Sequence, residues 1–408
     1  MLQIDLFCQV VDNYGDAGIS WRLASQLADE LPASVTLWID QPGILKKWQE
    51  SRKRLLACQP APQLGSLLVR DSAMLTSAPG TELASTFCAG DVCISLLAAE
   101  LPEHVLDAIT TRTTLWLRYE YLTAEAWTAD CHTLPSPHPQ RPLTQWFYCP
   151  GFTPDSGGLL RERGLAARRA NFSVDDAHHW LSGQQLQGPA NALHVCLFGY
   201  PDEPLRAFIR GLRKYDRPIH LILHEQLYRD LGEPASASGL TICCHPWLDQ
   251  DNFDHLLWSC DLNLVRGEES WIRAHWAEQP FLWQPYRQDN DAHCDKLDAF
   301  LERLSGGGRH NGGQNQAKPE WFCAAASAIT TLSQLISPPD ATVCGASDAT
   351  VCGASDATVA DEVMANAVHT YLEQLPAIRN IHRNWTKKLL EQSPVTDRIG
   401  AFIADHLQ

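Results

Sequence analysis

The chain has 408 residues, of which 45% are hydrophobic and 20% charged, and its formal net charge at pH 7 is −16. Two domains are expected, because one hydrophobic core rarely serves more than about 300 residues, and the acidic balance argues against a general nucleic-acid binder. No apolar run approaches the ~20 residues of a membrane span, and MLQIDLFCQ lacks the basic start of a signal peptide, so we expect a cytoplasmic protein without a membrane partner.

The first half of the sequence alternates between stretches typical of buried strands and stretches typical of amphipathic helices. Short apolar runs predict strands, and apolar residues at helical spacing predict helices between some of them. The expected strands are 2–9, 34–40, 64–71, 91–97, 113–120 and 145–152, and the expected helices include 18–31 and 102–110. Alternation of this kind indicates a parallel sheet covered by helices.

Residues 151–190 interrupt the alternation, because they are rich in glycine, arginine and polar residues. We interpret them as a connection into a second domain. From about residue 190 the alternation restarts, with expected strands at 191–200, 218–224, 239–247, 261–267 and 280–286 and expected helices at 201–216, 253–260 and 270–279. The sequence therefore predicts two successive α/β domains with a cleft between them.

The last part of the chain contains a short repeat and a helical tail. DATVCGAS occurs at 340–347 and again at 348–355, and DATV follows at 356–359. A period this short does not build a solenoid, so we interpret the repeat as a duplicated surface loop. The tail that follows is expected to form helices that cross back onto the first domain.

Cysteine and histidine are frequent but do not form a metal-binding pattern. The 14 cysteines are scattered singly through apolar runs without a C-x-x-C pair, and the 16 histidines are equally dispersed. Reduced cysteines buried in the core are the better interpretation. We expect no metal site.

The first candidate site is the turn VVDNYGDAG at 10–18, between the first expected strand and helix. Many α/β proteins bind phosphate at such a strand–turn–helix junction, but this one lacks the G-x-G-x-x-G spacing, although Asp40 fits the ribose-binding acid of dinucleotide folds. Asp12 and Asp16 would repel a diphosphate and would instead suit a cation or act as a base. The alternative is that Asp16 only caps a helix beginning near Gly18.

The second candidate site is the turn Arg266-Gly267-Glu268-Glu269-Ser270, which lies between an expected strand and an expected helix. Ser270 is predicted to be the N-cap, which leaves neighbouring N–H groups available to an anion. Arg266 supplies a positive charge suited to bidentate contact with phosphate. Glu268 and Glu269 are candidates for capping the helix or for holding sugar hydroxyls.

Gln250 and Phe253, just upstream, are candidates for reading a base edge and stacking on its face, although Phe253 is alternatively a core residue. A phosphate-binding turn in the second domain and an acidic turn in the first are typical of a glycosyltransferase with two Rossmann-like domains. In such an enzyme the C-terminal domain holds the nucleotide sugar, and the N-terminal domain presents the acceptor and the base.

Six stretches of the chain carry long, specific motifs: VVDNYGDAGISWRLASQL, LRYEYLTAEAW, PGFTPDSGGLLRE, LFGY, DNFDHLLWSCDLNLVRGEES and QPYRQDNDAHCDKLDAF. In these stretches the chain resembles the EarP family of protein-arginine rhamnosyltransferases, and the similarity runs from residue 2 to the final helix. The resemblance implies a GT-B fold and an inverting transfer of rhamnose from dTDP-β-L-rhamnose to one arginine of translation elongation factor P, which activates that factor. It implies no metal and no cofactor besides the donor substrate.

The resemblance also implies roles for particular residues. Asp16 matches the proposed catalytic carboxylate of the family and Asp12 the second aspartate of the same turn, and we add Glu268 to the catalytic set. Family donor-pocket positions fall on Phe198, Tyr200, Gln250, Phe253, Arg266, Glu268, Ser270 and Tyr286, and we also assign Asn13, Gly15 and Glu269 to donor binding. Glu269 departs from the family, which typically has aspartate there.

These assignments give three expected segments. Residues 1–170 form a Rossmann-like acceptor-binding domain, residues 186–370 form a Rossmann-like nucleotide-sugar-binding domain, and residues 371–408 form the returning helices. Because a guanidinium has a pKa above ~12 and offers no lone pair, we expect Asp12 to position it and Asp16 to take its proton late in the displacement. The open alternatives are another acceptor, a non-catalytic nucleotide-sugar-binding module, and a nicotinamide-dependent oxidoreductase.

Overall fold

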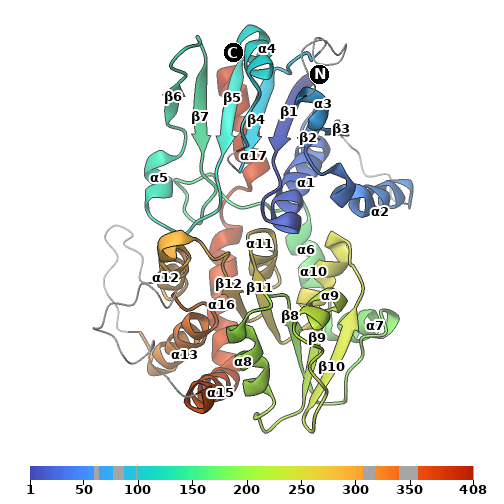
Figure 1. The fold of residues 1–408 in the computed structure, drawn as a ribbon, viewed down its shortest axis with the longest axis vertical. Coiled ribbons are helices and arrows are strands. Elements are labelled where there is room, and N and C mark those ends of the chain that lie inside the picture. The colour runs from blue at the N-terminus through green and yellow to red at the C-terminus, as the bar shows by residue number, and fades with distance from the viewer. Residues whose placement is uncertain (59–63, 77–86, 98, 307–317, 340–356, 408) are drawn as a thin grey trace. The chain divides into compact units, whose positions relative to one another are not determined.

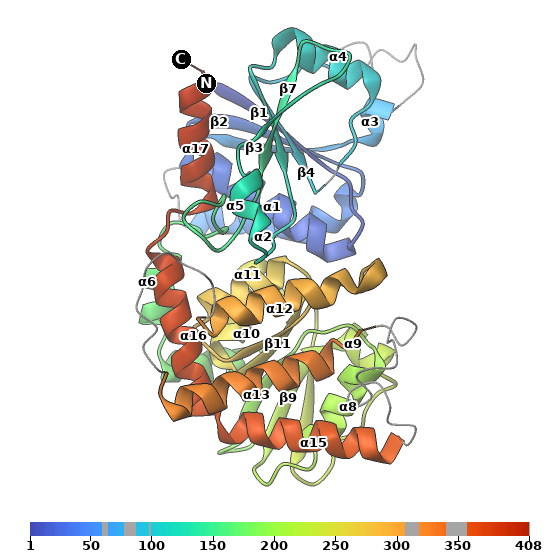
Figure 2. The same cartoon turned by 90° about the vertical axis from the view of Figure 1, so that its left-hand side faces the viewer.

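The computed structural model describes residues 1–58, 64–76, 87–97, 99–306, 318–339 and 357–407. The chain forms two compact units, one from Met1–Leu165 with Glu391–Gln408 and the other from Ala166–Leu390. Each unit contains one sheet with helices packed against it (Figures 1 and 2). Among the described helices, none is both long and apolar enough to span a bilayer. The two complete copies of the octapeptide repeat lie outside the described residues.

The sheet of the first unit has seven strands in the order β3-β2-β1-β4-β5-β7-β6. The strands are β1 (Leu2–Cys8), β2 (Ala33–Ile39), β3 (Ser66–Asp71), β4 (Val92–Leu96), β5 (Leu115–Tyr119), β6 (Pro135–Pro137) and β7 (Thr144–Tyr148). All neighbours are parallel except β6, which pairs antiparallel with β7. The strand order reverses between β1 and β4, and ligands of open α/β sheets bind beyond the carboxyl ends of the strands at such a point.

The helices of the first unit come from both ends of the chain. They are α1 (Asn13–Glu30), the 3₁₀ helix η1 (Pro42–Leu45), α2 (Lys46–Cys58), α3 (Ala73–Thr76), α4 (Glu103–Arg112), α5 (Trp127–Cys131) and α17 (Val395–His406). The hydroxyl of Thr396 on α17 donates to Glu30 Oε2 on α1 at 2.6 Å, and the Tyr148 hydroxyl lies 3.3 Å from the carbonyl of Val395 on α17. The final helix is therefore part of the first unit.

The sheet of the second unit has five parallel strands in the order β10-β9-β8-β11-β12. The strands are β8 (Leu193–Leu197), β9 (Ile219–His224), β10 (Leu240–His245), β11 (Leu262–Arg266) and β12 (Phe281–Gln284). Strands β8, β9, β11 and β12 are almost entirely buried, which is why their sequences read as continuous apolar runs, whereas β10 at the edge of the sheet is partly exposed. The order reverses between β8 and β11, so the carboxyl ends of these two strands mark the expected ligand-binding edge.

The helices of the second unit surround this sheet. They are α6 (Leu165–Asn171), α7 (Val174–Gly183), α8 (Glu203–Leu212), α9 (Glu225–Asp230), α10 (Gln250–Ser259), α11 (Glu269–Trp276), the 3₁₀ helix η2 (Asp289–Asp291), α12 (Ala292–Leu304), α13 (Glu320–Ile336), α15 (Ala357–Glu373) and α16 (Leu375–Leu390). Helix α15 packs against α8, where Arg210 contacts Asp361 with two nitrogens at 2.9 and 2.7 Å. Figure 2 shows α13 and α15 side by side along this unit.

The region predicted as a connection is partly helical. Helices α6 and α7 occupy most of 165–183, and α7 begins with a capping box in which Ser173 Oγ accepts from the Asp176 N–H at 3.1 Å. The units also divide the chain at different residues from the three expected segments. Residues 166–170 belong to the second unit, and the chain returns to the first unit at residue 391.

Candidate active site

In the first unit, Asp16 holds the turn that follows β1. Helix α1 begins at Asn13, so Asp16 lies in its first turn and the expected helix start near Gly18 is wrong. The Asp16 carboxylate folds back and accepts the N–H groups of Val11 at 2.7 Å and Asp12 at 2.8 Å. Its side chain thus satisfies backbone donors before the helix, instead of capping a helix start at Gly18.

The surroundings of Asp16 favour its neutral form. The residue is 3% exposed, and burial raises the pKa of its carboxyl above the ordinary value, with the charge of Asp40 adding to the rise and the two backbone hydrogen bonds opposing it. Asp40 itself accepts the N–H of Val10 at 3.0 Å, so it stabilises the same turn. A carboxylate with a raised pKa is a stronger proton acceptor when ionised, which suits a general base.

Asp12 lies beside Gly15 in the same turn. The Gly15 N–H donates to the Asp12 carbonyl at 2.6 Å, and a Cβ atom at position 15 would lie 2.7 Å from Asp12 Oδ2. Glycine at this position therefore leaves room for the Asp12 carboxylate. Asp12 is partly exposed, whereas Asp16 is buried below it, so the turn combines an accessible carboxylate with a protected one.

In the second unit, Arg266 ends β11 at the point where the strand order reverses. Its guanidinium carbon lies 5.1 Å from the centre of the Phe198 ring and 4.6 Å from that of Tyr200. Both aromatic residues follow β8, the neighbouring strand. Such cation–π contacts contribute roughly 0.5–2 kcal/mol and hold the planar cation over the rings.

The other residues assigned to the donor pocket in this unit surround the same turn. The Phe253 ring lies 5.3 Å from Phe198, and the Tyr286 ring lies 5.9 Å from Tyr200, both in edge-to-face geometry. Gln250 begins α10, and its Nε2 lies 3.5 Å from an oxygen of Glu269 at the start of α11. The sequence-predicted residues of the second unit therefore form one contiguous group.

Ser270 has a different role from the one predicted. The N-cap of α11 is Glu268, not Ser270, which lies within the first turn of the helix. The Ser270 hydroxyl donates to the Arg266 carbonyl and accepts the Arg266 N–H at 3.3 Å. Ser270 thus closes the turn on Arg266, while Gly267 adopts φ of +61°, which favours glycine.

Sequence reasoning missed two residues that support this turn. The indole N–H of Trp283 donates to the Gly267 carbonyl at 2.7 Å, and the side chain of Gln284 reaches the loop after β8. Both belong to β12, and the run PFLWQPY predicts a strand there without indicating these contacts. Asp12, Asn13, Gly15 and Asp16 lie in the first unit, so the assignment of Asn13 and Gly15 to donor binding stays a prediction.

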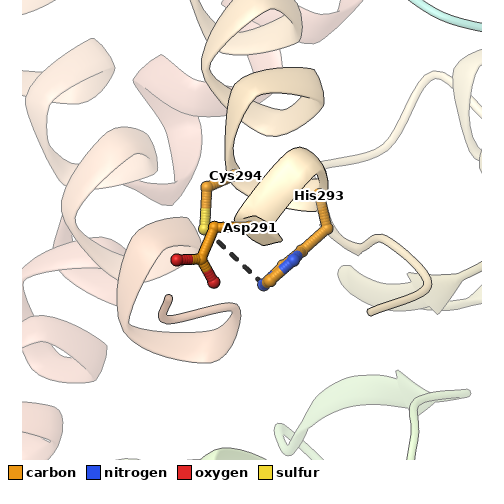
Figure 3. A group of neighbouring side chains, drawn as sticks. All are labelled: Asp291, His293 and Cys294. Carbon is orange, nitrogen blue, oxygen red and sulfur yellow. Dashed lines mark hydrogen bonds between the residues drawn. The ribbon is translucent and has the colours of Figure 1, made fainter. Parts of the chain in front are cut away.

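One group among the described residues combines three possible metal-ligand types. Asp291, His293 and Cys294 lie at the start of α12, with their ligand atoms within 4.8 Å of one another (Figure 3). The His293 Nε2 lies 3.2 Å from the Pro338 carbonyl and 3.5 Å from the Cys294 Sγ. The contact with Pro338 ties the start of α12 to the residues after α13.

The family whose pattern matches this sequence is described as Elongation-Factor P (EF-P) rhamnosyltransferase EarP, and the match spans residues 4–404. This chain belongs to the EarP family.

Curated relatives agree with the EarP assignment. The protein-arginine rhamnosyltransferase of Pseudomonas putida is 39% identical over 313 residues, which cover 73% of this chain and 80% of the relative. The protein-arginine rhamnosyltransferase of Pseudomonas aeruginosa is 37% identical over 325 residues, covering 75% and 83% respectively. That of Shewanella oneidensis is 37% identical over 328 residues, covering 73% and 79%.

A solved EarP structure has the same fold. The structure described as the basis for EarP-mediated arginine glycosylation of translation elongation factor EF-P matches with a TM-score of 0.59 and 25% sequence identity, covering 99% of both chains. The two Rossmann-like units of this EarP chain are those of a GT-B glycosyltransferase, which confirms the predicted fold class. The absence of G-x-G-x-x-G from the first turn agrees with this class rather than with a nicotinamide-dependent oxidoreductase.

Proposed function

We propose that this protein transfers rhamnose from dTDP-β-L-rhamnose to one arginine side chain of translation elongation factor P, with inversion at the anomeric carbon. The transfer to a protein arginine is supported by membership of the EarP family and by relatives named protein-arginine rhamnosyltransferases. The acceptor is supported by the EarP structure, which concerns arginine glycosylation of EF-P. The donor and the stereochemistry are what the resemblance to the EarP family implies, and the residues of the two turns are suited to a nucleoside diphosphate and a cationic acceptor.

The observation that carries the proposal is the set of contacts that the Arg266 guanidinium makes. Among the described residues, no carboxylate forms an ion pair with Arg266, and its guanidinium is held over two aromatic rings at the carboxyl end of β11. A cation fixed in this way beside a helix N-terminus is suited to a diphosphate. Phe198 and Phe253 provide aromatic faces for a base, and Gln250 provides an amide for its edge.

The acceptor side is assigned to the first unit. A guanidinium is a planar cation, and the partly exposed carboxylate of Asp12 is suited to hold it. Val11 and Tyr14, which flank Asp12, are 70% and 45% exposed. Large apolar side chains exposed beside an acidic turn suit contact with a protein partner. The partner must therefore bring both a basic side chain and an apolar surface.

The chemical step follows from these assignments. A guanidinium nitrogen of the acceptor attacks C1 of rhamnose, the C1–O bond to dTDP breaks, and its electron pair leaves on the diphosphate. Arg266 and the N–H groups at the start of α11 stabilise the charge that develops there. Asp16 accepts the proton that the attacking nitrogen loses, and Glu268 orients the sugar. One displacement converts a β-linked donor into an α-linked product.

No metal and no further cofactor is assigned a role, because the developing charge is met by Arg266 and the helix terminus. Since the acceptor is a translation factor, we place the reaction in the cytoplasm. In this mechanism the raised pKa of Asp16 serves the proton transfer, and the negative charge of Asp12 serves to hold the guanidinium. The two aspartates therefore have separable roles.

The experiment that tests the proposal is incubation of the protein with dTDP-β-L-rhamnose and purified elongation factor P. Peptide mass spectrometry should find one deoxyhexose on one arginine, and NMR of the product should show an α linkage. The matched control is Asp16→Asn, which should bind dTDP and give no product.

Two outcomes would replace the proposal. Transfer to a different protein from a cell extract, with none to elongation factor P, would indicate another acceptor. Binding of dTDP-rhamnose without transfer to any protein would indicate a non-catalytic nucleotide-sugar-binding module.

A further inference from the structure

Gln284 is a buried polar residue at the end of β12, the strand at one edge of the second sheet. Only 2% of it is exposed. In the parallel pairing of β11 with β12, Gln284 lies opposite Arg266. Its own carbonyl accepts the Gly267 N–H at 3.3 Å, so its main chain already contacts the Arg266–Gly267 turn.

The side chain of Gln284 reaches past the end of β11 to the loop that follows β8. Its Oε1 accepts the backbone N–H of Tyr200 at 2.7 Å, and its Nε2 donates to Asp202 Oδ2 at 2.8 Å. Asp202 is the N-cap of α8 and uses its other oxygen to accept the Leu205 N–H at 3.0 Å. One amide therefore joins β12, the loop after β8 that carries Phe198 and Tyr200, and the start of α8.

The space for this amide depends on Gly199. A Cβ atom at that position would lie 2.8 Å from Gln284 Oε1 and 2.9 Å from Leu264 Cδ2. Tyr200, the residue that Gln284 holds, is the aromatic ring nearer to the Arg266 guanidinium. In the sequence Phe198-Gly199-Tyr200, the middle residue therefore has no side chain, because the Gln284 amide occupies the place where a Cβ atom would lie.

We propose that Gln284 is a positioning residue of the donor site: its buried amide fixes Tyr200, and through Tyr200 it fixes the guanidinium of Arg266. This inference rests on the proposed donor site for its effect on catalysis, but the contact itself does not depend on the identity of the donor. Gln284 touches neither diphosphate nor sugar in this scheme. It acts by reducing the freedom of the loop that carries Tyr200.

The chemistry of the contact requires glutamine. One end of the side chain must accept from an N–H, and the other must donate to a carboxylate; a carboxamide of this length does both at any pH, whereas a carboxyl does so only when it is protonated. Methionine fills a similar volume but makes neither bond. Glutamate accepts from Tyr200 but places a second carboxylate beside Asp202 unless it carries a proton, and such carboxylate pairs share one proton because one pKa rises.

Three charged residues in the described part of the chain lie around this position. Asp202 lies 2.8 Å from the Gln284 amide nitrogen, Arg287 lies 3.7 Å from the same Asp202 oxygen, and Arg266 is the neighbour in the sheet. The carboxyl introduced by Gln284→Glu would therefore be governed mainly by its contact with Asp202. Protonated at mildly acidic pH, it can donate to Asp202 as the amide does.

The test compares Gln284→Met, Gln284→Glu and a control, Asn263→Leu, in the full-length protein. Asn263 is a buried amide at the other end of β11, where its Nδ2 donates to the Leu257 carbonyl at 3.0 Å. The control therefore loses a buried amide hydrogen bond in the same sheet without touching the loop. Two quantities are measured: amide hydrogen exchange of residues 198–203 without ligand, and the Kd of dTDP by calorimetry at pH 8 and pH 5.5.

Gln284→Met should speed exchange at residues 198–203 and raise the Kd of dTDP by about tenfold, the size expected for losing one or two hydrogen bonds. Gln284→Glu should resemble Gln284→Met at pH 8 and approach the unmodified protein at pH 5.5. Asn263→Leu should change neither quantity. The control separates this role from a loss of stability alone, because Asn263→Leu also loses a buried amide hydrogen bond in the same sheet.

Three outcomes would overturn the inference. The first is unchanged exchange and a Kd within twofold for Gln284→Met, and the second is an equal loss of affinity in Asn263→Leu. The third is the absence of rescue for Gln284→Glu at pH 5.5. If the unmodified protein does not bind dTDP, the proposed donor fails, while the exchange measurement, which needs no ligand, still decides the role of Gln284.

Discussion

The guanidinium carbon of Arg266 lies 4.6 Å from the centre of the Tyr200 ring, and the two residues come from the ends of neighbouring strands. The ring faces the cation, so the side chain of Arg266 is oriented before any anion is bound. A binding site that is ordered in advance loses less entropy when the ligand arrives. This pair is therefore the structural basis of the proposed donor site.

Replacement of Arg266 should weaken dTDP binding. Arg266→Ala removes charge-assisted hydrogen bonds worth about 1.5–3 kcal/mol, so calorimetry should show a Kd about 10- to 100-fold higher. The Kd of Arg266→Lys should lie between those of the unmodified protein and Arg266→Ala, because lysine keeps the charge but loses the planar fork of donors. Arg213→Ala, which removes one positive charge at the other end of α8, is the control and should bind normally. Equal affinity of Arg266→Ala and Arg213→Ala for dTDP would show that the donor does not bind at this turn.

Two substitutions at Asp16 should separate its structural role from its chemical role. Asp16→Asn keeps an oxygen that can accept the Val11 and Asp12 N–H groups, so the fold should survive while transfer is lost. Asp16→Ala leaves those donors without their acceptor and should destabilise the protein by about 1–3 kcal/mol or more. Thermal melting and a transfer assay measure the two effects. Transfer by Asp16→Asn at a normal rate would show that another group accepts the proton.

Gly15→Ala should reduce transfer without unfolding the protein. The added methyl group would lie 2.7 Å from Asp12 Oδ2, and the flexible carboxylate can move away, which displaces it from its position in the turn. We expect transfer to fall about tenfold or more, the scale that misplacement of a positioning group produces. Gly43→Ala is a matched control, because a Cβ atom there meets nothing within 4 Å. If both variants transfer equally well, the position of Asp12 is unimportant.

The protein should lose stability in mild acid. Burial lowers the pKa of His132, His220 and His245 to about 4 and that of His382 to about 3. The unfolded chain binds protons near pH 6.5, whereas these folded groups do not, so stability falls as the pH decreases from about 6.5 towards 4. Each such group contributes up to about 1.4 kcal/mol per pH unit across that window.

The buried carboxyls act in the opposite direction. The pKa values of Asp5, Asp16 and Glu30 are raised, mainly by burial, so their stabilising contribution is largest in acid and is lost as the pH rises through the raised values. The net pH dependence is measured by the Tm between pH 7.5 and 4.5, with His382→Phe as a comparison. A smaller acid effect in that variant is the expected result, and identical profiles would contradict the assignment of His382 as a buried neutral group.

Much of the fold follows from the sequence, because buried parallel strands such as 193–197 and 262–266 read as short apolar runs. The start of α1 does not, since Gly15 and Asp16 look like a turn although they lie in the first turn of the helix that begins at Asn13. The N-cap of α11 was also misplaced, because Ser270 is a better intrinsic cap than Glu268 but is used to close the turn. Local preference is overridden here by contacts with Arg266.

The candidate site divides in the same way. Charged residues at strand ends, such as Asp12 and Arg266, are visible in the sequence because their type and place are unusual. Gln284 is not, because a single polar residue in an apolar strand gives no sign of its partners, which are 82 and 84 residues away. Helix α7 was missed although Ser173 and Asp176 carry the spacing of a capping box.

The most direct test of the central claim is a crystal structure of the protein with dTDP bound. We predict that the diphosphate contacts Arg266 and the first N–H groups of α11, with the thymine near Phe198, Phe253 and Gln250. A diphosphate bound instead at Gly15 and Gly18, against the turn that holds Asp12 and Asp16, would contradict it.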